Sequence, residues 1–305
     1  MSILKFKKLA LIGLGLLGSS ISHAARKGNC VSIISGADHS PEARNTAMRL
    51  GLVDVIYEHP AEAVEDADLI ILCIPVGSYK SIAKSIGSVL KVGSIISDVG
   101  SVKSSVIIDV SPYLPRGVHF VPAHPIAGTE QSGPESGFAT LFDSKWCILT
   151  PPDGTEPSAV SKLVSFWQSF GSNVQIMSAE HHDLVLAITS HLPHLIAYNI
   201  VKTADHLERI SNAEVIKYSA GGFRDFTRIA ASDPTMWRDI FLNNKEAVLE
   251  MLGRFTEDLT DLQRAIRYGD GDRMLQIFNN SRNIRQAIVD AGQDTNVPDF
   301  GRRPL

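Results

Sequence analysis

The stretch Gly13-Leu14-Gly15-Leu16-Leu17-Gly18 decides the fold expected of this chain. It follows a short apolar run, residues 9–12, which predicts a strand, and precedes a helix-compatible segment, residues 19–27. In a strand–turn–helix unit these glycines permit a tight turn, close approach of a pyrophosphate and close packing of the helix on the strand. We therefore expect a dinucleotide to bind at Gly13, Gly15, Leu16, Leu17 and Gly18.

The kind of dinucleotide is indicated by Asp38, which lies 20 residues after Gly18 and close to the end of the next predicted strand, residues 31–35. A carboxylate at this place accepts hydrogen bonds from the ribose hydroxyls and repels a 2′-phosphate, which favours NAD over NADP. The alternative is that Asp38 caps the next predicted helix, residues 41–50. Ribose binding is the interpretation we favour.

Two further strands are predicted to end at the edge that carries the glycine loop. Residues 68–75 (DLIILCIP) form a continuous apolar run, typical of a parallel strand covered on both faces. Ile74 and Pro75, at its end, are therefore expected beside the cofactor. Ser101 follows the strand predicted for residues 94–98 and is expected at the same edge. It could also cap a helix that begins near Val102, and both roles are compatible.

A histidine follows the next apolar strand prediction, residues 118–123. The segment His124-Pro125-Ile126-Ala127-Gly128-Thr129-Glu130 comes directly after it. A side chain at the C-terminal end of a strand in such a sheet faces the crevice where ligands bind. The turn residues can bring a second group close to the imidazole. We therefore expect His124 at the centre of the active site.

The strand signals stop near residue 178. Two more strands are predicted, at residues 145–150 and 173–177, around a helix at 158–170. The remaining segments have helical periodicity: residues 179–207, 212–220, 234–268 and 272–291. An apolar stripe suited to packing on other helices, within the subunit or across a dimer, is formed by Val248, Leu252, Phe255, Leu259, Leu262 and Ile266.

These patterns predict an α/β Rossmann-type dinucleotide-binding domain at residues 1–178 and an all-helical C-terminal domain, for substrate binding and dimerisation, at residues 179–292. An irregular tail is expected at residues 293–305. The chain has 305 residues, 44% hydrophobic and 20% charged, with a net charge of -4, which argues against a general nucleic-acid binder. No apolar run was identified that approaches the ~20 residues of a membrane span, and we expect a cytoplasmic protein.

Two other features of composition support this placement. Three lysines before residues 9–18 imitate a signal peptide, but only a strand followed by a turn explains the glycine spacing. Cys30, Cys73 and Cys147 lie far apart in apolar segments, which predicts buried free thiols in a reducing compartment, and neither a disulfide framework nor a zinc site.

The helical half contributes two polar motifs. In Ser190-His191-Leu192-Pro193-His194 the two histidines resemble a metal pair, but no further ligand stands at metal-site spacing, so no metal is expected. The second motif, residues 221–228, has two glycines followed by Arg224, Asp225 and Arg228, and it predicts a loop that presents guanidinium groups to a carboxylate. A surface ion-pair network is the alternative. Trp237 lies in the first turn of a helix that begins at Pro234.

Taken together, HPIAGTE (residues 124–130), SHLPH (190–194), GGFRDFTRIA (221–230) and SDPTMWRD (232–239) resemble the prephenate/arogenate (cyclohexadienyl) dehydrogenases of tyrosine biosynthesis. The resemblance extends from about residue 8 to about residue 288. It implies a homodimeric enzyme that uses NAD to oxidise the ring alcohol of prephenate or arogenate, while the ring carboxylate leaves as carbon dioxide. Some members of the family carry a fused chorismate mutase or a C-terminal regulatory module; because few residues precede the first predicted strand and only a short tail follows residue 291, we expect neither here.

The resemblance assigns roles to individual residues. His124 is expected to accept the proton of the ring hydroxyl, and Ser101 to orient that hydroxyl. Arg228 is expected to bind a substrate carboxylate. The remaining expected substrate-site residues are His194 with Asp225 as its partner, Glu130 paired with Arg224 near the entrance, and Thr129 and Trp237.

Two other functions fit parts of the pattern. A dehydrogenase of the β-hydroxyacid type also joins a Rossmann domain to a helical one, but such enzymes generally use a helical lysine. Here only Lys202, Lys217 and Lys245 are available, in no such motif. A non-catalytic NAD-binding sensor would not need His124, Ser101 and Arg228 together. Prephenate and arogenate are not distinguished by these residues.

Overall fold

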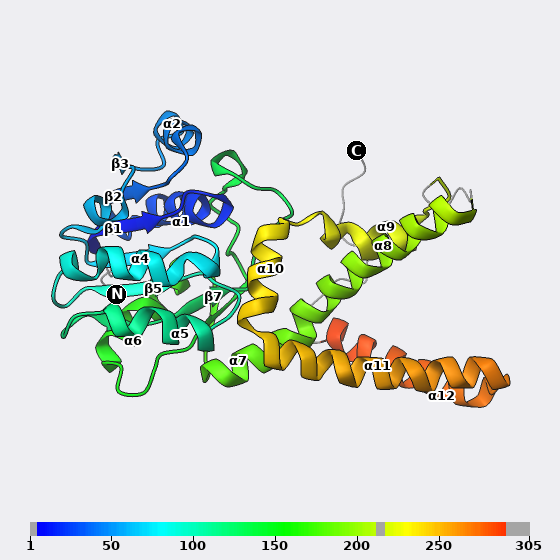
Figure 1. The fold of residues 1–305 in the computed structure, drawn as a ribbon. Coiled ribbons are helices and arrows are strands. Elements are labelled where there is room, and N and C mark those ends of the chain that lie inside the picture. Colours follow the sequence, from blue (N-terminus) through cyan, green and yellow to red (C-terminus); the bar gives the residue numbers. More distant parts are fainter. Residues whose placement is uncertain (1–4, 212–216, 291–305) are drawn as a thin grey trace. The chain divides into compact units, whose positions relative to one another are not determined.

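The computed structural model describes residues 5–211 and 217–290, and its first half is built on a six-stranded parallel sheet (Figure 1). The strands are β1 (Phe6–Ile12), β2 (Val31–Ala37), β3 (Val55–Tyr57), β4 (Leu69–Leu72), β5 (Ile95–Asp98) and β6 (His119–Phe120). Their order is β3-β2-β1-β4-β5-β6, which is the doubly wound Rossmann arrangement. The predicted fold class is confirmed. β1 lies inside this sheet, so the basic and apolar N-terminal stretch is a strand, as predicted.

Helices cover both faces of the sheet because successive residues of each strand point to opposite sides. Leu9 and Leu11 of β1 join one apolar cluster with Phe166 and Trp167, whereas Ala10 and Ile12 join the other. The helices of this half are α1 (Leu16–Lys27), α2 (Pro41–Arg49), α3 (Pro60–Val64), α4 (Tyr79–Ile86), α5 (Ser104–Val110) and α6 (Pro157–Gln168).

The single strand predicted for residues 118–123 is wrong, because the chain changes sheets at Pro122. The amide of Val121 still donates to Ile96 O of the parallel sheet (2.9 Å), while Pro122 has no N–H and its carbonyl accepts from Thr150 (3.0 Å). A second sheet then begins, with β7 (Ala123–Pro125) antiparallel to β8 (Trp146–Leu149) and β8 parallel to β9 (Asn173–Ile176). His124 therefore lies within β7 and not beyond the end of a parallel strand.

The helical half begins with one long helical run, as predicted. It consists of α7 (Ala179–Leu186), a π-helical turn (Ala187–His191) and α8 (Leu192–Ser211). The part Ala179–Glu208 is long and apolar enough to cross a membrane, with a mean hydropathy of 1.5 in its most apolar window. Core helices of soluble proteins also meet this criterion of length and composition. The expectation that no run reaches this length is therefore corrected. A helix was predicted for residues 212–220. Residues 212–216 lie outside the described residues, and residues 217–220 are not helical.

The segment predicted as a loop, residues 221–228, is mostly helical. It forms α9 (Gly221–Thr227), followed by a 3-10 turn, Arg228–Ala231. The long helix predicted for residues 234–268 is interrupted at Asn244, which has φ -121° and ψ 37°, so that α10 (Pro234–Asn243) and α11 (Lys245–Tyr268) are separate. Asp233 caps the N-terminus of α10, and its carboxylate accepts from Met236 N (2.7 Å).

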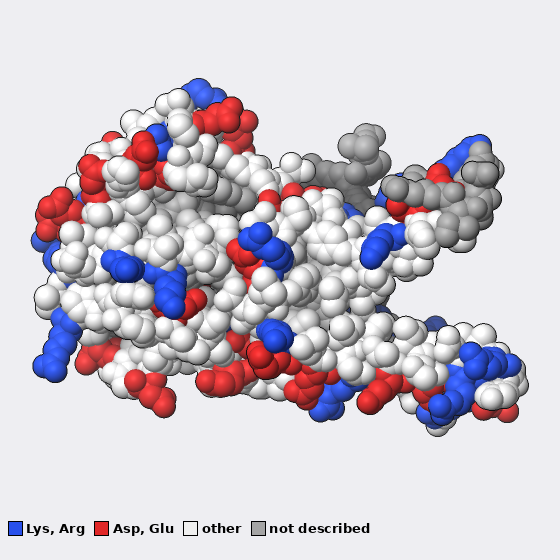
Figure 2. Space-filling view, in the orientation of Figure 1, with Lys and Arg blue, Asp and Glu red and all other residues white. Residues whose placement is uncertain are grey.

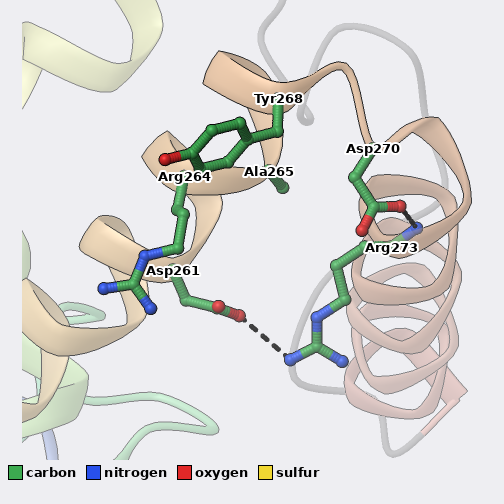
Figure 3. A pocket seen from close by; sticks show the side chains of 6 residues that line it. All are labelled: Asp261, Arg264, Ala265, Tyr268, Asp270 and Arg273. Atoms are coloured by element: carbon green, nitrogen blue, oxygen red, sulfur yellow. Dashed lines mark hydrogen bonds and ion pairs between the residues drawn. The ribbon is translucent and has the colours of Figure 1, made fainter.

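Packing divides the described residues into two compact units, with the boundary between residues 248 and 249. In the second unit α11 is followed by α12 (Gly271–Asp290) after a turn at Gly269, whose φ is +69°. An ion pair between Asp261 and Arg273 (2.9 Å) joins the two helices beside a shallow pocket, and Asp270 accepts from Arg273 N (3.0 Å) (Figure 3). The predicted tail, residues 293–305, lies outside the described residues.

The surface charges and the cysteines can be compared with the expectations from composition. On the face shown in Figure 2, basic and acidic side chains of the described residues lie in small, interspersed groups. All three cysteines are free thiols, as predicted; Cys30 and Cys147 are buried and Cys73 is half-buried.

Candidate active site

The three glycines of the loop between β1 and α1 have different structural roles. Gly13 has φ +92°, and a Cβ there would lie 2.4 Å from Cys73 O and 2.8 Å from Ile74 Cγ2. A Cβ at Gly18 would lie 2.1 Å from Gly13 O. By contrast, a Cβ at Gly15 would meet no heavy atom of the described residues within 4 Å. Gly13 and Gly18 are therefore needed for the fold, whereas Gly15 leaves room for a ligand at the N-terminus of α1, where backbone amides attract phosphate.

Asp38 stands beside this loop at the end of β2. One carboxylate oxygen accepts from Leu14 N (2.9 Å) and the other from Ser40 N (2.9 Å). The side chain that caps α2 is Ser40, which accepts from Ala43 N (3.2 Å), so Asp38 is not the cap of that helix. Each oxygen of Asp38 retains a lone pair for a ribose hydroxyl. The loop and Asp38 together fit NAD.

His124 is the buried histidine at the start of the second sheet. Its Nδ1 lies 2.8 Å from Nε2 of His182. Burial lowers the pKa of His124 well below its usual value, and His182 and Lys103 add to this effect. The imidazole is therefore neutral at pH 7, as a general base must be. Ser101 is half-buried in the loop after β5, and its backbone lies close enough to His191 to affect the pKa of that ring.

His182 and Asp183 lie behind His124 in the first turns of α7. The helix begins at Ser178, whose hydroxyl accepts from His181 N (3.2 Å). Asp183 Oδ1 lies 2.8 Å from Nδ1 of His182, and the carboxylate also accepts from the backbone amides of Lys103 and Ser104, at 2.8 Å each. Burial alone would raise the pKa of Asp183, but the hydrogen bonds from His182 and Ser104 hold it below its usual value.

A buried ion pair attaches β7 to the main sheet. Lys103 is fully buried and donates to Asp98 Oδ2 and to Ala123 O (2.8 Å). Asp98 Oδ1 accepts from Ala123 N (3.0 Å), and Oδ2 accepts from Gly100 N (2.8 Å). Because both groups bind the residue before His124, the pair sets the position of the histidine. Burial lowers the pKa of Lys103, and Asp98 opposes this effect.

Two more histidines lie on the helical side of the site. The Asn244 amide donates to Asp183 O (2.8 Å) and to His191 Nδ1 (3.1 Å), and burial lowers the pKa of His191 to about 4. His194 stacks on Trp237, with 3.6 Å between ring centroids. Its Nδ1 donates to Ser190 O (2.9 Å), which is a different partner from the expected Asp225. Burial also lowers the pKa of His194.

The acidic and basic residues of the site pair differently from the expectation. Glu130 pairs with Arg228 (3.0 Å) and not with Arg224, because the turn after α9 brings Arg228 to the loop after β7. Arg224 is exposed and lies 3.8 Å from Asp225. Arg228 is near enough to His194 to lower the pKa of that ring. Thr129 accepts from Gln131 N (3.2 Å) in the same loop as Glu130.

The polar groups that lie behind the site were not predicted from the sequence: Asp98, Lys103, His182, Asp183 and Asn244. The signal for His182 and Asp183 was a histidine and an acid in the first turns after the helix cap Ser178; their burial is a result of the tertiary structure. Lys103 had none, because an isolated lysine after a strand is usually exposed. Within the described residues, no group of three or more His, Cys, Asp and Glu side chains could hold a metal ion.

Comparison with known proteins places this geometry in a family. The nucleotide-binding domain of prephenate dehydrogenase matches residues 21–176, and the dimerization domain of prephenate dehydrogenase matches residues 178–280. The chain is 44% identical to a cyclohexadienyl dehydrogenase of Zymomonas mobilis over 93% of its length and 96% of that protein. It is 32% identical to a prephenate dehydrogenase of Bacillus subtilis, over 92% and 76% of the two chains.

A solved structure agrees with these sequences. Prephenate dehydrogenase from A. aeolicus, in complex with hydroxyphenyl propionate and NAD+, has a TM-score of 0.86 and 34% identity, covering 92% of this chain and 98% of its own. The resemblance inferred from the four motifs is thus confirmed, and so is the expected NAD cofactor. The chain belongs to the prephenate dehydrogenase family of NAD-dependent oxidoreductases and spans both the nucleotide-binding and the dimerization domains of that family.

Proposed function

We propose that the chain catalyses the NAD-dependent oxidative decarboxylation of prephenate or arogenate, with His124 as the proton acceptor. The observation that carries this proposal is the bond from Nδ1 of His124 to buried His182 (2.8 Å). The other ring nitrogen, Nε2, has no hydrogen-bond partner among the described residues and can take a proton from the substrate hydroxyl. The glycine loop and Asp38 would hold NAD, which would supply the acceptor for the hydride from the carbon that bears this hydroxyl.

The other residues hold the substrate. Ser101, in the exit loop of β5, orients the ring hydroxyl towards His124. Arg228 binds a substrate carboxylate with its planar fork, and this requires Glu130 to give up all or part of its 3.0 Å ion pair. The pair is half-exposed, so its exchange for a substrate carboxylate involves little loss of free energy. The bond from the ring to the carboxylate then breaks, its electron pair moves through the ring to the oxygen, and carbon dioxide leaves as the ring becomes aromatic. The resulting phenolate takes back the proton held by His124, which restores the neutral imidazole.

Further substrate contacts are assigned to the second half of the pocket. His194 is held between Ser190 and Trp237 as a neutral ring whose Nδ1 donates to Ser190 O, so its Nε2 can accept a hydrogen bond from the substrate. Thr129, Arg224 and Asp225 lie on the segments that carry Glu130 and Arg228, which supports a place for them at the entrance. The cofactor contacts are assigned to the glycine loop, to Asp38, and to Ile74 and Pro75 after β4.

The test is the initial rate of NADH formation with prephenate and with arogenate, each repeated with NADP. We expect turnover of at least one substrate with NAD, and its loss in His124→Asn while the affinity for NADH is retained. The ratio of kcat/KM between the substrates then names the enzyme. Tight NADH binding without turnover of either substrate would contradict the proposal and favour a β-hydroxyacid substrate or a sensor role.

We also propose a cytoplasmic homodimer, with the substrate and dimerisation domain beginning at residue 179. The apolar stripe of α11 supports the dimer: Leu259 and Ile266 are exposed, as are Leu275, Phe278 and Ile284 of α12. Light scattering during gel filtration should give a mass of two chains, twice 33.1 kDa. Ile266→Glu together with Phe278→Glu should shift the mass towards one chain, and an unchanged dimer would exclude this face as the interface.

A further inference from the structure

We infer that His182 and Asp183 act as a positioning pair that sets the tautomer of His124, so that Nε2 is the basic nitrogen. The inference deepens the proposed function and rests on His124 as its base. Neither residue is required to touch the substrate. Two consecutive hydrogen bonds join the carboxylate of Asp183 to His182 and His182 to His124, and the tautomer of His124 depends on which atom donates in each.

The series of hydrogen bonds begins at Asp183, whose ionised carboxylate can only accept hydrogen bonds. Its two oxygens already receive the backbone N–H groups of Lys103 and Ser104, at 2.8 Å each. Both contacts favour the carboxylate over the carboxylic acid, and the pKa of Asp183 is accordingly held low against the effect of burial. The third contact, 2.8 Å from Nδ1 of His182 to Oδ1, must therefore carry its hydrogen on the histidine.

The hydrogen on Nδ1 decides the state of the other nitrogen of His182. The ring is fully buried, and burial lowers its pKa, with Asp183 acting in the opposite direction. A neutral imidazole with a hydrogen on Nδ1 has only a lone pair on Nε2. This lone pair faces Nδ1 of His124 at 2.8 Å, so the hydrogen between the two rings belongs to His124. Nε2 of His124 is then unprotonated.

The same arrangement stabilises the state after proton transfer. When Nε2 of His124 takes the substrate proton, the ring becomes positively charged and its Nδ1–H remains bonded to His182. His182 is in turn bonded to the Asp183 carboxylate, whose negative charge favours this cation. The other charged or titratable groups that act on His124 are Lys103, itself paired with Asp98, and His191. Both lower the pKa of His124, so the Asp183 carboxylate provides the compensating negative charge.

A protonated His182 would reverse the arrangement. With hydrogens on both nitrogens it would donate to Nδ1 of His124, and a neutral His124 would then carry its hydrogen on Nε2, where it could not act as the base. Burial of His182 disfavours this cation. The pair is thus suited to keep one tautomer, and a merely space-filling side chain would not do so.

The direct measurement is the 15N chemical shifts of histidine ring nitrogens in the free enzyme labelled with 15N-histidine, with His124→Asn used for assignment. We expect the His124 resonances of a protonated Nδ1 and an unprotonated Nε2. This measurement needs no substrate. A hydrogen on Nε2 of His124 would overturn the inference even if the enzyme turns over prephenate.

Two matched substitutions separate positioning from packing. Glutamine can place a carbonyl oxygen near the position of His182 Nε2, whereas asparagine reaches only the position of Nδ1. We expect His182→Gln to keep the tautomer of His124 and kcat within about tenfold, and His182→Asn to mix the tautomers and lower kcat by on the order of 100-fold or more, with KM little changed. Equal kcat in the two variants would count against the inference.

Asp183→Asn and His181→Ala complete the set. An amide at position 183 must turn an N–H towards one of its three donors, so we expect a loss of kcat similar to that of His182→Asn, together with a lower midpoint of thermal unfolding. His181 is the exposed neighbour, and its alanine variant should match the wild type in tautomer and kcat. If the tautomer responds to His182 as described but neither substrate is turned over, the proposed function fails and the positioning pair stands.

Discussion

The imidazole of His194 lies flat on the indole of Trp237, with 3.6 Å between ring centroids and 21° between ring planes. The contact joins α8 to α10, and Trp237 is in turn buried in the apolar cluster under α3, α4 and α5. The position of His194 is therefore coupled to the core of the nucleotide-binding fold.

Loss of this stacking should weaken substrate binding and raise KM. An aromatic stack contributes about 0.5–1.5 kcal/mol beyond its buried area, equivalent to about two- to tenfold in binding. We expect Trp237→Leu to raise KM by this factor, because His194 loses the surface that orients it, whereas Trp237→Phe should keep KM within about twofold. Steady-state kinetics with the preferred substrate measures both. Equal KM values in the two variants would show that His194 is oriented by Ser190 alone.

Alanine substitutions in the glycine loop should separate folding from cofactor binding. At Gly15 a Cβ meets no described atom, so Gly15→Ala should leave the midpoint of thermal unfolding within a few degrees but weaken NADH binding by about tenfold or more. At Gly18 the Cβ would lie 2.1 Å from Gly13 O, so Gly18→Ala should lower the midpoint strongly. NADH fluorescence titration and thermal scans test the pair. A large loss of stability in Gly15→Ala would contradict the assignment.

Breaking the buried ion pair by removing one partner should cost far more stability than breaking a surface pair. Lys103→Met leaves the Asp98 carboxylate buried without its ammonium partner, which is expected to reduce the free energy of unfolding by about 3–5 kcal/mol. Lys91→Met removes the partially exposed ion pair with Asp68 and should change the free energy of unfolding by less than about 1 kcal/mol. Urea denaturation measures both variants. Adding Asp98→Asn to Lys103→Met should recover part of the loss, since the unpaired charge is removed.

The pH dependence of kcat/KM should follow the protonation of His124. Only the neutral ring can accept the substrate proton, so activity is present above its pKa and is lost as the pH falls through that value. Burial, His182 and Lys103 lower this pKa below 6.5, so we expect the acid limb of the profile to have its midpoint below pH 6.5. The apparent value belongs to the coupled pair His124–His182. A midpoint near or above pH 7 would contradict the role of burial.

Replacement of Arg228 tests the site for the substrate carboxylate. Lysine keeps the charge but loses the planar fork, so Arg228→Lys should raise KM by about tenfold with a smaller change in kcat. Arg254→Lys, in a surface pair with Glu250 on α11, serves as the matched control and should leave both constants unchanged. An unchanged KM in Arg228→Lys would show that the guanidinium remains paired with Glu130 and that the carboxylate binds elsewhere.

Local physics in the sequence was enough to predict most of the fold and the cofactor site. Apolar runs of strand length, glycines where the backbone must turn tightly, and helical periodicity are properties of neighbouring residues. They placed β1, α1, β2, β4 and β5 and the loop at Gly13 close to where they are observed. Asp38 was expected at this edge because it follows its strand directly, and the structure places it there beside Leu14; its binding of a ribose stays a prediction. His124 was found through a motif, although its strand was misplaced.

The pairing of polar groups was decided by the tertiary structure. Whether Glu130 binds Arg224 or Arg228 depends on the path of the chain after α9, and the sequence pattern fits either. Asp98 accepts a hydrogen bond from Ala123 N, and Lys103 donates one to Ala123 O. Both contacts form only because the chain changes sheets at Pro122. His182 meets His124 across 58 positions of sequence. Such contacts join residues remote in the chain, and their energy depends on burial and on donor–acceptor geometry that no local pattern encodes.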